Sequence, residues 1–503
     1  MSSPEYSIII PAYNEAERLE ATLRRVKVGA SSGGQVQVLD GIKSGDRVVI
    51  YGHNQLTTGE ALEMFKRSVD ADRIKAFSAR NNLAAAHRDR YADTAKQADF
   101  ETAETQIQNV LAVDTSNRSA YENLARLYYD RGRLRDRSYL VHDGTYALVI
   151  DPQRDTDRVE EAARDAGVTI THVAETHIHN DYLTGGLELA RAHCASYLVN
   201  AADHVEFERQ PISDGQCIQV GALTVRAVAT PGHTHTHLSF VVDDGGQQAV
   251  FSGGSLLYGS VGRTDLVAAE DTLGLAHDQY ASVRRLAGEA ASGAALFPTH
   301  GFGSFCSSGP ASRAGSSTIG EQLTSNHALT DPDEDHFVQE LIANLTAFPS
   351  YYAHMGVTNA AGPGPADLTV PESLDAAELM RRLDGGEWVV DLRRRVAFAS
   401  NHLLGSVSFE YGTSFSTYLG WILPWGEQLT LVGSREDVEK AIRDLSRIGI
   451  DSPDAALGTD PHTLAPRAAL ASYPRVGWDG VLAGKAPGDT VVDVWRADEY
   501  AAS

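Results

Sequence analysis

The chain has 503 residues, 42% of them hydrophobic and 22% charged, an ordinary globular balance that allows three or more domains. Its formal net charge is -24, and such an acidic surface argues against nucleic-acid phosphates or an anionic membrane as the main partner. A small anionic substrate is still compatible, because a pocket can be locally positive. We therefore expect no nucleic acid and no membrane among the partners.

The cysteines and the apolar runs predict a reducing compartment. Cys194, Cys217 and Cys306 are the three cysteines, and such wide spacing does not make a disulfide framework. The first apolar run, Ile8–Ile10, is short and has no basic flank, so it does not resemble a signal peptide. No apolar stretch is long enough to span a bilayer. We expect a cytoplasmic protein whose oligomeric state is open, a homo-oligomer included.

Residues 1–60 are predicted to be a mosaic of fragments. The stretch SIIIPAYNE from Ser7 resembles the start of a family 2 glycosyltransferase, whose first strand leads into a nucleotide-sugar pocket, but the paired aspartates of that family do not follow. Alternation over Gln35–Leu39 predicts a strand. The stretch VLDGIKSGDRVVIYGHNQLTTGE resembles the last β-domain of an efflux-pump periplasmic adaptor. Neither fragment predicts an activity.

Residues 61–135 have a helical period, and Ala103–Gly132 resembles a tetratricopeptide repeat. At most two such repeats fit, and fewer than three seldom stand alone, so we expect a helical spacer rather than a peptide-binding groove.

From Ser138 the pattern becomes α/β, and residues 136–325 are predicted to form one domain. Its first elements are expected to be strands at 139–141 and 146–150, a helix at 156–166 and a strand at 168–174. Residues 326–365 are predicted to be a linker with a helix at 337–348. The Ser-, Gly- and Ala-rich stretch 309–330 is expected to be a loose linker, and the acidic run 331–335 a solvated, mobile one.

Three predicted strands of this domain each end in side chains that bind metal ions. They are His177, His179 and Asp181 after Val168–Ala174, His233 after Leu223–Ala229, and His300 after Phe297–Thr299. Since the first three alternate, an extended backbone points them to the same side. Neutral imidazoles and a carboxylate suit zinc, iron or manganese. Ligands at several strand ends therefore predict a metal pocket on one rim of a rigid scaffold.

These residues resemble the metallo-β-lactamase superfamily, through the motifs THIHND, PGHT and PTHG. The block FSGGSLLYG followed by GRTDL is similar to the persulfide dioxygenase and glyoxalase II branch, and the resemblance extends from Ser138 to about Gly362. It implies an αββα sandwich that binds Zn2+ or Fe2+. By this resemblance the metal ligands are His177, His179 and His233 at a first site, and Asp181 and His300 at a second. The resemblance also predicts a substrate pocket with Arg263, Asp265, Tyr182 and His237, although a structural role for His237 is equally expected.

Two positions depart from the family pattern. Tyr182 stands where the motif has its last histidine, and Gly254 stands where the family has an aspartate that bridges two metals or completes an iron site. The residues therefore favour a single metal on histidines with an open position, as in catalytic zinc sites. Cys306 follows His300 near this pocket, so it is either a reactive thiol or, more commonly, a small buried hydrophobe.

Residues 366–450 resemble a rhodanese domain, through WVVDLR at Trp388–Arg393 and a strand at Leu429–Val432. The loop Gly433–Asp437, where rhodaneses carry their catalytic cysteine, has none, so cysteine persulfide transfer is not expected there. Within residues 460–503, the stretch Thr490–Glu499 resembles the opening of a second such domain. The predicted fold class is thus α/β: the sandwich, a rhodanese-like α/β domain, and a mosaic β and helical N-terminal region.

The function predicted from these features is a metal-dependent enzyme of sulfur or thiol metabolism. Its substrate would be a small thiol, thioester or persulfide of the glutathione type, an inference that rests partly on the fusion to rhodanese-like units. In a hydrolytic version Asp181 is the catalytic residue that orients or deprotonates a water. In an oxidative version, iron binds dioxygen and a persulfide. The alternative is a non-catalytic scaffold or binding module with a degenerate metal site.

Overall fold

The structure is a computed structural model, and it describes residues 136–300, 305–308, 316–466 and 469–475, together with the backbone of 27–32 and 35–40. The chain divides into two compact units, 1–131 and 132–503. In the first unit, β1 (Lys27–Ser32) and β2 (Gln35–Asp40) form an antiparallel hairpin, and β2 confirms the predicted strand. The glycosyltransferase-like and tetratricopeptide-like stretches lie outside the described residues, as do most of the adaptor-like stretch and Thr490–Glu499.

The second unit begins with a five-stranded sheet in which the strands follow one another in chain order. The first pair is antiparallel and the other pairs are parallel. The strands and the helices between them are β3 (Tyr139–His142), β4 (Tyr146–Ile150), α6 (Asp157–Ala166), β5 (Thr169–Ala174), α7 (Gly186–His193), β6 (Ser196–Asn200) and β7 (Gln210–Ile212). The first four of these elements confirm the predicted ones to within one residue at each end.

A six-stranded sheet follows, with the order β13-β12-β11-β10-β9-β8. Its pairs are antiparallel except β11 with β12, which are parallel and are joined through a long helix. The elements are β8 (Cys217–Val220), β9 (Leu223–Ala229), β10 (Leu238–Asp243), β11 (Gln248–Gly253), η1 (Ala269–Asp271), α8 (Thr272–Glu289), β12 (Ala295–Pro298) and β13 (Ser317–Thr318).

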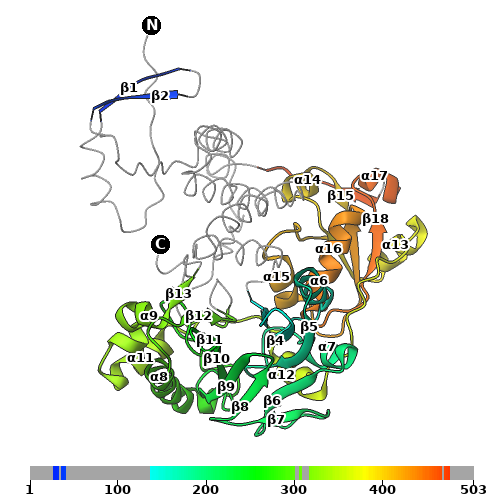
Figure 1. The fold of residues 1–503 in the computed structure, drawn as a ribbon. Coiled ribbons are helices and arrows are strands. Elements are labelled where there is room, and N and C mark those ends of the chain that lie inside the picture. The colour runs from blue at the N-terminus through cyan, green and yellow to red at the C-terminus, as the bar shows by residue number, and fades with distance from the viewer. Residues whose placement is uncertain are drawn as a thin grey trace. The chain divides into compact units, whose positions relative to one another are not determined.

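Alternation of apolar side chains explains why the two sheets stack. In β4, Leu148 and Ile150 face the second sheet and share a buried cluster with Phe240 of β10. Their neighbours Ala147 and Val149 point the other way, into a cluster with α6 and α7. On the second sheet, the outward side chains pack against α8 in the same manner. Because side chains alternate along a strand, this pattern gives the αββα sandwich that the sequence predicts, seen in the cyan and green part of Figure 1.

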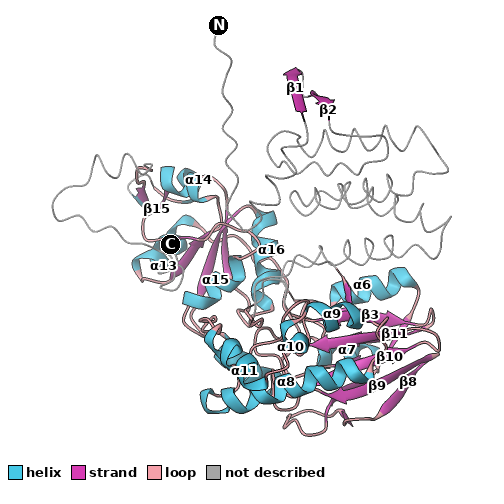
Figure 2. Cartoon of the chain, turned by 90° about the vertical axis from the view of Figure 1, so that its left-hand side faces the viewer, coloured by secondary structure: helices cyan, strands magenta, loops and turns pink. Residues whose placement is uncertain are grey.

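The stretch expected as a loose linker is instead partly helical. It contains α9 (Ile319–Ser325) and α10 (His327–Thr330), and α9 starts with a capping box between Thr318 and Glu321. The acidic run is ordered as well, since Asp333 caps α11 (Glu334–Ala343), which packs on α8 (Figure 2). The predicted helix at 337–348 both starts and ends earlier, with Asn344 as its C-cap. Then comes α12 (Tyr352–Ala361).

The C-terminal part is a four-stranded parallel sheet in the order β16-β14-β17-β18. Figure 2 shows helices around this sheet. Ser434 caps α16 directly after β17, so the end of the expected loop Gly433–Asp437 is the first turn of a helix. The rhodanese-like identity of this part remains a prediction. The elements are α13 (Ala376–Asp384), β14 (Trp388–Asp391), α14 (Arg395–Ser400), β15 (His402–Leu403), β16 (Val407–Ser408), α15 (Phe415–Ile422), β17 (Leu429–Gly433), α16 (Arg435–Ser446), β18 (Asp454–Leu457), α17 (Pro461–Leu464) and β19 (Leu470–Ala471).

The sandwich and the C-terminal sheet share buried contacts. Asp155, which precedes α6, receives hydrogen bonds of 2.9 and 2.6 Å from the buried Arg447 after α16. The Leu183 N–H donates to the Arg447 carbonyl at 2.7 Å. Leu183 and Tyr351 also lie in one apolar cluster with Leu419 of α15. None of the described helices meets the length and hydropathy that crossing a bilayer requires.

Candidate metal centre

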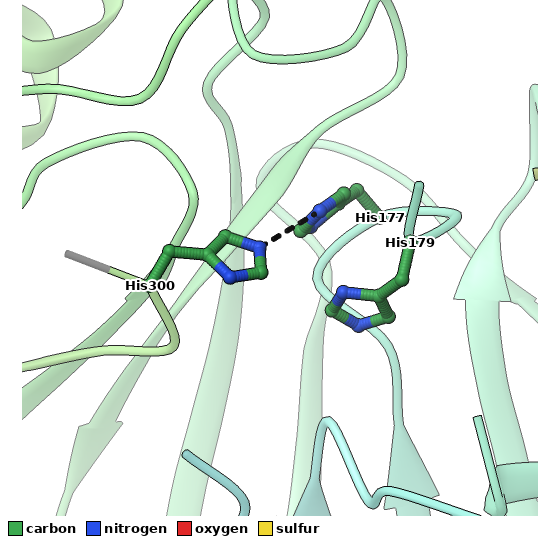
Figure 3. A group of neighbouring side chains, drawn as sticks. All are labelled: His177, His179 and His300. Carbon is green, nitrogen blue, oxygen red and sulfur yellow. Dashed lines mark hydrogen bonds between the residues drawn. The ribbon is translucent and has the colours of Figure 1, made fainter. Parts of the chain in front are cut away.

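Four histidines meet at the rim where strands of both sheets end. His177 and His179 follow β5, His233 follows β9 and His300 follows β12, and each is at most 1% exposed. Figure 3 shows the rings of His177, His179 and His300 facing one another. The ring centroids of His177 and His233 are 4.9 Å apart, and those of His233 and His300 are 5.3 Å apart. The sequence prediction that three strand ends deliver histidines to one place agrees with this geometry.

The hydrogen bonds of His177 leave its Nε2 atom with a lone pair. The Thr176 hydroxyl donates to Asp151 at 2.8 Å, so it accepts from Nδ1–H of His177, 2.9 Å away. Nε2 lies 3.4 Å from Nε2 of His300 (Figure 3). His300 in turn directs Nδ1 at Asp136, 2.9 Å away. With both Nδ1 atoms protonated, two lone pairs face each other unless a proton or a metal ion lies between them.

His179 is oriented by two buried carboxylates. Its Nε2 atom lies 3.3 Å from Asp151 and 3.2 Å from Glu175, so Nε2 carries the proton and Nδ1 faces away from both acids. Burial alone would lower the pKa of His179, but these charges raise it to about 10. Burial raises the pKa of Glu175 above its usual value. A carboxylate that receives the second N–H of an imidazole is the usual support of a metal-binding histidine.

His233 is fixed from the opposite side. Its Nδ1 atom donates to the Arg263 carbonyl at 2.7 Å, so Nε2 is the atom left to bind. Burial lowers the pKa of His233 well below its ordinary value and keeps the ring neutral. Within the described part of the chain, Nε2 of His233 and Nδ1 of His179 have no hydrogen-bond partner although both are buried.

A buried imidazole nitrogen without a hydrogen-bond partner is costly, and a cation relieves that cost. At Nε2 of the neutral His233 the cation would be a metal ion, whereas at Nδ1 of His179, whose pKa is raised, it is a proton until a metal ion replaces it. The histidines therefore fit a metal ion. Other groups orient their rings, and Nε2 of His233 and Nδ1 of His179 have no hydrogen-bond partner. One donor atom each from His177, His179 and His300 lie within 4.8 Å of one another. His233 belongs to a second such group, with His300 and Cys306. His300 thus belongs to both groups and links His233 to the first two histidines.

Asp181 reaches this cluster through His300. One carboxylate oxygen lies 3.3 Å from Nδ1 of His300, beside Asp136, and these three residues form a donor group of their own. Burial raises the pKa of Asp181 to about 6. Its carboxylate is thus near the histidines, on the Nδ1 side of the His300 ring, and its catalytic or ligand role remains a prediction.

Tyr182 and His237 bond to the protein around the pocket. The Tyr182 hydroxyl lies 3.0 Å from Nε2 of His179, and the two rings stack with centroids 4.3 Å apart. His237 accepts the Gly254 N–H at Nε2, 3.0 Å away, so its Nδ1–H donates to Thr230 at 2.8 Å. Burial lowers the pKa of His237 to about 3, so it is neutral. Of the two roles that the sequence left open for His237, these bonds favour the structural one.

Arg263 connects the pocket to its surroundings. Its guanidinium is buried and pairs with Asp265 through bonds of 2.7 and 2.8 Å. It also donates to the carbonyls of Phe305 and Thr346, at 2.9 and 2.6 Å. A substrate-binding role for Arg263 and Asp265 stays a prediction, whereas a positioning role follows from these bonds.

Gly254, where the family has a carboxylate, lies against the ring of His233. A Cβ atom at this position would stand 2.2 Å from Cδ2 of His233, closer than two such atoms approach. Gly262 approaches the same ring from another direction, since its Cβ would lie 2.8 Å from Nδ1. The ring therefore fills the space that a longer side chain at residue 254 would need.

Sequence reasoning missed several supporting residues. Asp151, Glu175 and Asp136 hold the histidines, yet they fall outside the motif spacing. Glu175 directly precedes the THIHND motif, so its position was a usable signal. Cys306 is buried, and burial together with the Asp181 charge raises the pKa of its thiol well above the ordinary value. In the absence of a cation this thiol is therefore protonated.

Residues 132–216 and 219–300 match the model of the Metallo-beta-lactamase superfamily. The chain therefore contains a metallo-beta-lactamase superfamily domain. A metallo-beta-lactamase from Staphylococcus aureus subsp. aureus COL has a similar solved structure, with 27% identity and a TM-score of 0.57, over 65% of this chain and 96% of that one.

Curated relatives match a shorter stretch. Atrochrysone carboxyl ACP thioesterase from Aspergillus terreus (strain NIH 2624 / FGSC A1156) is 35% identical over 126 residues, which is 24% of this chain and 38% of the relative. Atrochrysone carboxyl ACP thioesterase AgnL7 from Paecilomyces divaricatus is 32% identical over 127 residues, 24% of this chain and 39% of the relative. The chain thus spans about two fifths of the length of these relatives.

Proposed function

We propose that this chain is a metal-dependent hydrolase that acts on a thioester. The observation that carries the proposal is the buried cluster of four histidines. In it, Nε2 of His233 and Nδ1 of His179 have no partner, while a hydroxyl, carboxylates and a carbonyl fix the outer nitrogens of the rings. Relatives named as thioesterases support hydrolysis of a thioester in particular. The substrate class includes acyl groups carried on glutathione or on a pantetheine arm, since both present a thioester to the pocket.

His177, His179, His233 and His300 would hold the metal ion, Zn2+ or Fe2+. A divalent ion bound there supplies Lewis acidity that polarises a carbonyl and lowers the pKa of water. The carboxylate of Asp181 would take up the proton of the attacking water, in the role the sequence predicts. Asp151 and Glu175 keep His179 in the tautomer that leaves Nδ1 available, and Arg263 does the same for Nε2 of His233.

A second candidate is oxidation of a persulfide at an iron ion, which the GRTDL block favours by its resemblance to the dioxygenase branch. Gly254 weighs against it, because the carboxylate of that branch is missing. A third is a scaffold without catalysis. In this reading, Tyr182 and Gly254 have replaced two ligands of an ancestral site.

The test begins with elemental analysis of the full chain purified without added metal. Zinc- and iron-loaded samples are then assayed with an acyl-glutathione thioester, an acyl-pantetheine thioester, and glutathione persulfide with an oxygen electrode. We expect thiol release from a thioester, abolished in His177→Ala. Oxygen uptake with persulfide alone would favour the second candidate. Bound metal with no turnover of any of the three substrates would leave only the scaffold.

A further inference from the structure

Cys306 shares a donor group with His233, the histidine whose ring lies against Gly254. Its sulfur and one nitrogen each of His233 and His300 lie within 4.8 Å of one another, and all three residues are fully buried. A lone buried cysteine is usually a small apolar residue. Here the neighbouring Nε2 of His233 is a buried donor atom without a partner, which is a separate sign that a ligand belongs there.

Arg263 fixes His233 and Cys306 together. Its carbonyl accepts from Nδ1 of His233 at 2.7 Å, while its N–H donates to the Cys306 carbonyl at 3.0 Å. The bridge between Gly262 and Ser307 and the guanidinium bond to Phe305 tie the same two segments. The sulfur and the imidazole are therefore held by one backbone framework, as preorganised ligands are.

We propose that Cys306 is a metal ligand, whose thiolate joins His233 and His300 and takes the place of the carboxylate missing at residue 254. A soft thiolate together with imidazoles would favour zinc or another thiophilic divalent ion, whereas the iron of a dioxygenase takes only oxygen and nitrogen ligands. Coordination deprotonates the thiol, so binding releases a proton to solvent. This inference rests on the proposed function only in requiring a metal in the pocket, because it does not require turnover.

The experiment uses Co2+ as the metal, since cobalt bound to a thiolate shows a charge-transfer band in the near ultraviolet besides its visible bands. The full chain carries His336→Ala throughout, because His327, His336 and Glu340 form an exposed donor group that could also take up cobalt. Cys306→Ser and Cys306→Ala are compared with Cys194→Ser and Cys217→Ser. The last two alter exposed thiols and serve as matched controls.

We expect the charge-transfer band in the parent and in both control variants, and its loss in both Cys306 variants. Cobalt affinity should fall by at least the roughly 10–100-fold that loss of an outer-shell partner costs. Because Cys306 also packs against Tyr352, thermal midpoints in the presence of a chelator report whether a variant is folded.

Cobalt that binds with visible bands but without the thiolate band would overturn the role of Cys306 and leave the hydrolase proposal standing. A thiolate band without thioester hydrolysis would support the role of Cys306 and overturn the hydrolase proposal. A chain that binds no cobalt at all would overturn both.

Discussion

The ring of His233 lies so close to Gly254 that a Cβ atom there would stand 2.2 Å from Cδ2 of the ring. The only side chain compatible with this approach is hydrogen, so the glycine is a condition for the position of His233. The lack of a carboxylate at residue 254 and the position of the His233 ring therefore depend on each other.

Gly254→Ala should displace His233 and weaken metal binding on the order of 10–100-fold, as disturbed support of a metal ligand does. Competition against a chromophoric chelator measures this affinity. Gly274→Ala is the matched control, because nothing lies within 4 Å of a Cβ there and alanine suits its position in α8. Unchanged affinity in Gly254→Ala would mean that His233 does not bind the metal from this position.

Two histidines of one turn should behave differently when replaced. His233 is fully buried with an unpaired Nε2, whereas the His235 side chain is 51% exposed and pairs with Asp271. His233→Ala should lose most of the bound metal, and His235→Ala should keep it. Elemental analysis of the two purified variants, side by side with the parent chain, checks this. Equal metal content in all three would exclude His233 as a ligand.

The buried pair of Asp155 and Arg447 should be sensitive to removal of one partner. Both side chains are at most 1% exposed, so Arg447→Met leaves a buried carboxylate short of its main partner. Such losses cost about 3–5 kcal/mol in unfolding free energy. Urea unfolding measures it. Arg381→Met, at a side chain 60% exposed, should leave the unfolding free energy nearly unchanged. Similar values for both would contradict the role of the buried pair.

The same pair predicts a pH dependence of stability. Burial alone would raise the pKa of Asp155, but the charges of Arg447 and Arg158 hold it far below the ordinary value. Because the folded pKa is depressed, the stabilisation is complete above the unfolded pKa of about 3.9 and is lost as pH falls below it. The difference in unfolding free energy between the parent and Asp155→Asn should therefore be constant from pH 7 to about 5 and shrink below about 4. A difference that grows on acidification would refute this assignment.

The sequence predicts the strands of the sandwich well because they are short apolar runs that end at turns or at the histidine motifs. The strands at 139–141, 146–150, 168–174 and 223–229 are all present, and β9 has the predicted bounds. The histidines were found for a related reason, since each lies directly after a strand and strand ends of a sandwich meet at a rim. The helix α9 was missed although Thr318 and Glu321 have the spacing of a capping box, because the Ser- and Gly-rich composition around them outweighed that signal.

Contacts between residues far apart in the chain could not be predicted from the spacing of residues within motifs. Nothing in the sequence indicates that Asp151 orients His179 or that Arg263 fixes both His233 and Cys306, because these contacts depend on how the two sheets stack. The grouping of donors is a further example. Motif order predicts His233 with the first two histidines, and spacing did not indicate that His300 also lies beside those two or that Cys306 lies beside His233.

The bond from the Leu183 N–H to the Arg447 carbonyl bears on the order of synthesis. Leu183 lies two positions after Asp181, in the loop that carries the first histidines, and its partner is translated much later. Since domains fold from the N-terminal side as the chain emerges, the sandwich can form on the ribosome while this loop still lacks its hydrogen bond to Arg447. The loop that carries the first histidines therefore gains this restraint only once the chain has been made as far as α16 and the residue after it.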